Sequence, residues 1–180
     1  MTGIPRFERR IKIRGAKLFS ITTLHPPIAD HPLELADTEI WNRDGFYSST
    51  QPTRVTVPTG YAGVYSVHSV VQWGIGLLAD RFRPEIRDGS YFITQLAKNG
   101  SVADDLNEAR AFDPPTIPTR ICRQDVFWEA DLEDNSYIEV LVSNQAFDQS
   151  VMDQYDILYG AAWFYRLEHW LTIRRLGRLP

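Results

Sequence analysis

Cys122 is the one residue of this chain whose side chain is an intrinsically strong nucleophile, and it is the only cysteine. It lies within a run of alternating apolar residues, where a cysteine usually packs as a small hydrophobic side chain and is seldom catalytic. A lone cysteine cannot close an intramolecular disulfide, which favours a reducing compartment over secretion. We therefore expect Cys122 to be structural.

His25 and His31, with Asp30 between them, are the first candidate metal ligands. Prolines surround both histidines, and their spacing matches no ordered zinc motif. We interpret them as loop histidines and predict no metal there.

Asp131, Glu133 and Asp134 form an acidic cluster of the kind that can hold calcium. The cluster lacks the ligand spacing of an EF-hand, so a solvated turn between two strands is the stronger interpretation and calcium the weaker one. No phosphate-binding glycine loop, Ser-His-Asp order or paired-carboxylate motif is recognisable. The sequence predicts no catalytic residue, no metal, no cofactor and no enzymatic activity.

Composition indicates one globular domain. The chain has 180 residues, of which 43% are hydrophobic and 23% charged. Its N-terminus has no apolar run of signal-peptide length, and no run reaches the roughly 18 to 20 apolar residues of a membrane-spanning helix. We expect neither export by a signal peptide nor contact with a membrane.

Charge is unevenly distributed, although the net charge is only −4. Residues 1–17 carry six basic residues and one acidic residue, and residues 171–180 carry three basic residues and no acidic one. We predict a basic N-terminal arm (1–17), a jelly-roll domain (18–170) and a basic C-terminal tail (171–180). These ends are expected to contact an acidic partner, with solvated termini as the alternative. The basic candidates for that contact are Arg6, Arg9, Arg10, Lys12, Arg14, Arg174, Arg175 and Arg178.

Strands, and not helices, are predicted to position these residues. Short runs of β-branched and aromatic residues alternate with polar ones, and almost nothing follows the helical period. The clearest run is Gly63 to Trp73, which has little charge on either face. We expect one face inside a sandwich and the other against a second subunit. The other predicted strands are residues 11–14, 17–22, 38–41, 54–57, 91–97, 121–130 and 136–143, and a segment starting at residue 161.

The connections complete the fold prediction. Gly15 is predicted to turn between the first two strands, and residues 24–35, with three prolines, to form a loop or an edge. Residues 131–135 are predicted to join a hairpin, and residues 101–119 and 146–158 to form long surface loops. About eight strands without helical crossovers predict an all-β, two-sheet antiparallel jelly-roll sandwich.

Six short motifs occur in a fixed order along the chain. They are WNRDGFY at 41–47, QPTRVTVP at 51–58, AGVY at 62–65, QLAKNG at 95–100, EDNSYIEVLV at 133–142 and WFYRL at 163–167. Together they resemble the C1q/TNF-like jelly-roll domains of bacteriophage structural proteins. The sequence departs from that pattern at Asn135-Ser136, where the family usually has Gly-Asp, and at Thr59-Gly60-Tyr61, which lengthens the gap before Gly63.

The resemblance implies a homotrimer whose Gly63 strand lines the threefold axis. Val64, Ser66, His68 and Val70 would then face that axis, across a heterologous interface that closes into a ring. Three copies of His68 could bind an anion, a metal or water, and would repel one another when protonated. A hydrogen-bonded His68 with no switching role is the stronger interpretation.

The resemblance also implies a place in a virion, after assembly in the host cytoplasm. We expect a capsid decoration (cement) protein, in which the trimer binds the major capsid protein and the basic ends contact and stabilise the head shell. The alternative is a tail, fibre or spike component that binds tail proteins and a receptor, although no shaft or coiled coil is recognisable. A cellular C1q-like signalling module is disfavoured, because we see no collagen repeat. We expect no specific nucleic-acid partner.

Overall fold

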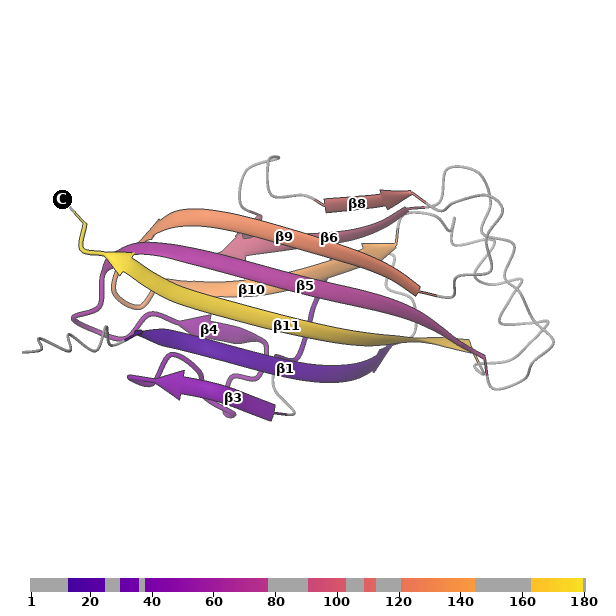
Figure 1. Ribbon diagram of the computed structural model, residues 1–180, viewed down its shortest axis with the longest axis horizontal. Coiled ribbons are helices and arrows are strands. Elements are labelled where there is room, and N and C mark those ends of the chain that lie inside the picture. The colour runs from indigo at the N-terminus through magenta and orange to yellow at the C-terminus, as the bar shows by residue number, and fades with distance from the viewer. Residues whose placement is uncertain are drawn as a thin grey trace, which may run out of the picture.

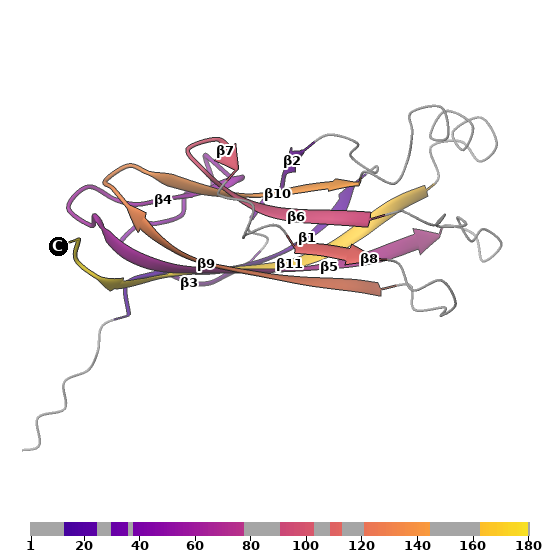
Figure 2. The ribbon, with the colours of Figure 1, turned by 90° about the horizontal axis from the view of Figure 1, so that it is seen from above.

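The described part of the protein is a sandwich of two antiparallel β-sheets (Figure 1). This computed structural model describes residues 13–24, 30–35, 38–77, 91–102, 109–112, 121–144 and 163–179. Figure 2 shows the two layers edge-on, with β10 and β6 above β5, β9 and β11. Within the described residues, no helix is long and apolar enough to cross a membrane.

Five strands form the first sheet, called sheet A here, in the order β3-β1-β11-β5-β9. They are β3 (Thr38–Arg43), β1 (Gly15–Leu24), β11 (Trp163–Gly177), β5 (Gly63–Leu77) and β9 (Ile121–Leu132). Strand β11 pairs with β1 on one side and with β5 on the other. The first and last long strands of the described chain are therefore neighbours at the centre of the sheet.

The second sheet, sheet B, has the order β2-β10-β6-β7, with β4 also pairing to β10 and β8 to β6. Its strands are β2 (His31–Pro32), β10 (Tyr137–Asn144), β6 (Tyr91–Lys98), β7 (Ser101–Val102), β4 (Arg54–Thr56) and β8 (Ala109–Phe112). Because β9 lies in sheet A and β10 in sheet B, the chain passes from one layer to the other between them.

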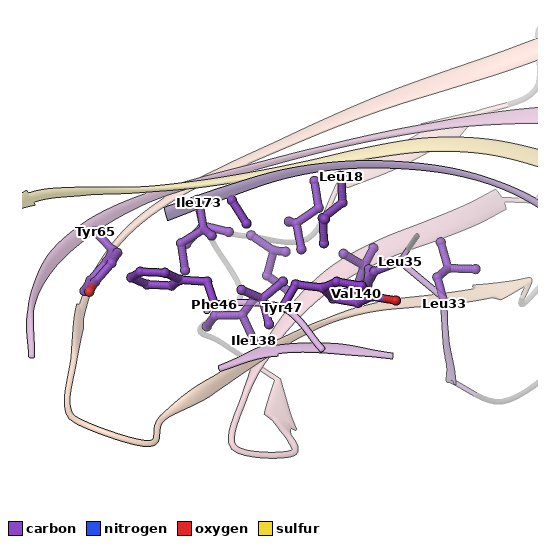
Figure 3. Close-up of a cluster of buried hydrophobic side chains, with 14 of the residues drawn as sticks. Leu18, Leu33, Leu35, Phe46, Tyr47, Tyr65, Ile138, Val140 and Ile173 are labelled. Atoms are coloured by element: carbon purple, nitrogen blue, oxygen red, sulfur yellow. The ribbon is translucent and has the colours of Figure 1, made fainter. Parts of the chain in front are cut away.

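The core forms where the inward side chains of both sheets meet. Tyr65 and Val67 of β5 are fully buried, as are Ile138 and Val140 of β10. Phe46 lies between the sheets, and its ring centroid is 5.9 Å from that of Tyr65 (Figure 3). The period-two alternation in the sequence places these apolar residues on one face of each sheet.

Some of the buried side chains are polar. Ser20, Ser69, Gln124 and His169 are buried among the sheet A strands. Thr94 of β6, also buried, donates a 2.6 Å hydrogen bond to the Oε1 atom of Gln124. This bond joins the two sheets and satisfies two buried polar groups, which would be costly to leave unpaired.

The structure confirms the predicted all-β jelly-roll sandwich and most of its strands. The strand at Gly63 extends to Leu77. Pro32 lies on the edge strand β2, as expected for a residue without an N–H group. Asn99 and Gly100 both have positive φ, at 53° and 79°, and form the predicted tight turn.

Two predicted connections are wrong. Gly15 does not turn; it begins β1 with φ of 138°, and a Cβ there would collide with the backbone carbonyl of Ile173. Glycine is required because the neighbouring strand approaches closely. Residues 131–135 do not join a hairpin, since β9 pairs with β5 and β10 pairs with β6.

The predicted region boundaries also differ from the structure. The arm predicted for residues 1–17 ends earlier, because Gly15, Ala16 and Lys17 belong to β1. Most of the tail predicted for residues 171–180 is strand β11, which ends at Gly177. The basic residues of this segment suggested a tail outside the domain. Instead, Leu171 and Ile173 are fully buried, because β11 lies between β1 and β5 in sheet A.

The predicted loops are only partly covered by the structure. Strands β7 and β8 lie within the loop predicted for residues 101–119, so that segment is not wholly irregular. Residues 146–158, like residues 1–12, are outside the described residues.

We predict that Leu18→Ala lowers the free energy of unfolding by about 2 to 5 kcal/mol, because Leu18 is fully buried and its removal leaves a cavity. Val102→Ala, at a side chain 45% exposed on β7, should cost less than about 0.5 kcal/mol. Urea unfolding of both variants measures the difference. Equal losses would contradict the described core.

Candidate subunit interface

The outward face of sheet A has an apolar centre. Phe19, Trp170 and Val70 are neighbours in one row across β1, β11 and β5. The rings of Phe19 and Trp170 stack at 5.1 Å between centroids. Phe127 of β9, in the next row, is 57% exposed. We call Phe19, Trp170, Val70 and Phe127 the apolar centre.

A network of charged and polar side chains borders this centre on β9. The Nε2 atom of His68 lies 3.2 Å from Oδ1 of Asp125. Arg123 donates from Nε to Oδ2 of Asp125 at 3.0 Å. The hydrogen bond from Arg123, together with that from His68, holds the pKa of Asp125 below its usual value. Asp125 is therefore an anion that positions both neighbours on the sheet surface.

The four residues predicted to face a threefold axis share this surface. Val64, Ser66, His68 and Val70 alternate on the outward side of β5, opposite the buried Tyr65. His68 also packs near Phe127, with ring centroids 6.4 Å apart. Their common orientation is now established, while their contact with other subunits stays a prediction.

The predicted basic contact residues fall into three groups. Arg14 lies over the Tyr61 ring at 4.9 Å, and Arg175 lies at 5.9 Å from the same ring and donates to the carbonyl of Ala62. Both therefore help to hold the loop before β5. Arg174 and Arg178 are exposed. Arg6, Arg9, Arg10 and Lys12 are outside the described residues.

Asp134 has a structural role that the sequence analysis did not predict. Its carboxylate accepts hydrogen bonds from the backbone N–H groups of Gly60 at 2.8 Å, Tyr61 at 3.0 Å and Ala62 at 2.8 Å. The bond from Gly60, followed by that from Ala62, lowers the pKa of Asp134. This clamp fixes the loop that leads into β5.

The candidate metal ligands from the sequence do not form a common site in the described residues. Asp131 and Glu133 are exposed, while Asp134 is held by the backbone. His31 is exposed on the edge strand β2, and His25 is outside the described residues. In the segments that the structure covers, no three His, Cys, Asp or Glu residues are grouped to bind a metal ion. Cys122 lies in β9 as predicted.

Sequence reasoning missed Phe127, Asp125 and Trp170 as parts of the surface. The alternation of β9 indicated which of its residues share a face, but pairing with β5 places them beside His68. The pairing partner of a strand is a long-range property that local patterns do not specify.

Sheet order, layer arrangement and strand alternation together define a two-sheet jelly roll of the C1q/TNF type. The structure is similar to a solved structure described as the globular domain of zebrafish complement 1qA protein, with a TM-score of 0.54 and 7% sequence identity. The match covers 92% of this chain and 99% of that one. No protein-family model and no curated protein matches the sequence.

We predict that Asp134→Asn lowers the melting temperature at neutral pH, because the clamp loses its charge and half of its acceptors. Folding lowers the pKa of Asp134, so the clamp stabilises the protein above the unfolded-state pKa of about 3.9. That contribution is lost as the pH falls through the lower folded-state pKa. The difference in melting temperature between wild type and Asp134→Asn should therefore become smaller as the pH falls.

Thermal unfolding of wild type and variant between neutral pH and about pH 2.5 measures this effect. Glu133→Gln, next to Asp134 but exposed, is the matched control and should leave the melting temperature nearly unchanged. A deficit that is the same at all pH values would contradict the role of the carboxylate charge.

Proposed function

We propose that this chain is a bacteriophage virion structural protein, and specifically a trimeric capsid decoration protein that binds and stabilises the head shell. One observation carries the proposal: the two basic ends leave the domain together. The N–H of Arg175 donates to the carbonyl of Arg14 at 3.0 Å, and Gly15 pairs with Arg174. In Figure 1 the end of β11 and the start of β1 lie at the same end of the sandwich.

This arrangement supports attachment at one place on each subunit. Arg174 and Arg178 are exposed near the point where residues 1–12, with four basic side chains, join the domain. Basic segments attached to the domain at neighbouring points would favour electrostatic binding to an acidic surface. Three subunits would present three such clusters, and multivalent binding is much tighter than a single contact.

The phage assignment is supported by the ordered motifs, which resemble those of phage jelly rolls, and by the C1q-type fold. The trimer is supported by the apolar centre, because exposed aromatic side chains bordered by charges are typical of protein interfaces. A role of this kind requires no catalytic residue and no cofactor.

We predict that Val70→Arg converts the trimer to a monomer. Val70 is 7% exposed and pairs with Trp170 on one side and Asp125 on the other. The much larger arginine side chain would project from this face and prevent close packing of a second subunit, even where Asp125 pairs with its charge. Sedimentation velocity should give three times the chain mass for wild type and one chain mass for the variant. Val102→Arg on sheet B is the control and should remain trimeric; an unchanged Val70→Arg trimer would contradict the proposed contact face.

We predict that the protein cosediments with expanded head shells of its parent phage. The test variant replaces Arg6, Arg9, Arg10 and Lys12 with glutamine in the full-length chain, which leaves β1 intact. Its binding should fall by at least about tenfold and wild-type binding should weaken with salt.

Two outcomes would contradict parts of this proposal. If neither protein binds shells and both bind isolated tails or host cells, the tail or fibre alternative replaces it. If the neutral variant binds shells as tightly as wild type, the basic arm has no role in attachment.

A further inference from the structure

On the outward face of sheet A, acidic side chains predominate on the edge strand β9, although Arg123 is also there, and the other strands carry several basic ones. On β9 the outward side chains include the acidic residues Glu129 and Asp131 in addition to Asp125. On the strands beyond β5, the outward side chains include Arg174 of the central strand β11, Lys17 of β1 and Arg43 of the edge strand β3. Acidic side chains therefore gather on β9, called the acidic edge here, and basic ones on β11, β1 and β3, called the basic edge.

Among the residues that the structure describes, most of these charges have no ion-pair partner. Asp125 is bound by Arg123 and His68. Among the described residues, no ion pair joins Glu129 or Asp131 to the basic edge. Glu129, Asp131, Arg43 and Arg174 are all exposed. These charges are therefore available to a second molecule.

The two edges also match in position along the strands. Ser66 of β5 pairs with Glu129 on one side and with Arg174 on the other, and Arg174 shares its row with Gly15 and Arg43. Glu129, Arg174 and Arg43 therefore lie at one level of the sheet. In a ring whose axis follows β5, the acidic edge of one copy meets the basic edge of the next at the same level.

We propose that a second copy of this chain is the partner of each edge, with Glu129 and Asp131 of one subunit pairing with Arg43 and Arg174 of the next. The inference rests on the proposed homotrimer and adds the interaction that fixes how neighbouring subunits are oriented. It assigns Arg174 to the contact between subunits and leaves Arg178 and the basic side chains of residues 1–12 to the proposed shell contact. Apolar contacts are not directional, so the centre alone permits several packings. Opposite charges at the two edges favour the head-to-tail ring, and like charges disfavour packing of β9 against β9.

Charge reversal at each edge tests this pairing. The acidic-edge variant is Glu129→Lys with Asp131→Lys, and the basic-edge variant is Arg43→Glu with Arg174→Glu. Each leaves two edges of like charge and should raise the trimer dissociation constant by at least about tenfold. In the variant with all four substitutions, the charges of the two edges are exchanged and again opposite. Its trimer dissociation constant should return to within a few-fold of the wild-type value. High salt should reduce the defect of the two single-edge variants.

Sedimentation equilibrium measures the dissociation constants, and thermal unfolding confirms that each variant is folded. Asp30→Lys with Glu34→Lys, at exposed positions on either side of the sheet B strand β2, is the control for a change of net charge. If the four-substitution variant associates no better than the single-edge variants, the edges do not meet and the inference is wrong. If wild type itself is monomeric, the proposed trimer fails; a stable trimer that neither reversal affects refutes only the charge pairing.

Discussion

The pairing of β11 with both β1 and β5 is the interaction on which the structure depends. It joins the two ends of the described chain at the centre of sheet A. Glycines permit the close approach: a Cβ at Gly63 would overlap the Gly177 carbonyl, and one at Gly15 would overlap that of Ile173. The same pairing brings the basic ends together, so the position of the proposed attachment point follows from sheet order.

Alternation along these strands gives sheet A two different faces. Leu171 and Ile173 of β11 enter the core, whereas Trp170 faces outward beside Phe19 and Val70. A sheet with one face in a core usually carries polar residues on the other. Apolar and aromatic side chains on the second face are therefore the basis of our proposal that another copy of the chain covers it.

The sequence was sufficient for the fold class and for placing Val64, Ser66, His68 and Val70 on one face of their strand, because period-two alternation is a local signal. That this face points outward was implied only by the resemblance to known jelly rolls. It was not sufficient for the partner of each strand. The connection at residues 131–135 looked like a hairpin, but Asp134 instead fixes the loop before β5, and this contact spans more than seventy residues of chain. The aromatic residues Phe127 and Trp170 became part of one surface only through that long-range pairing.

The central claim is that the outward face of sheet A is buried between copies of the chain. Hydroxyl-radical footprinting of the wild-type assembly, with a dissociated variant for comparison, tests it directly. The account predicts strong protection of Phe127 and Trp170 in the assembly and equal oxidation of Tyr137, which lies on sheet B beside Arg54. Equal oxidation of Phe127 and Trp170 in both states would place the contact elsewhere and contradict the account.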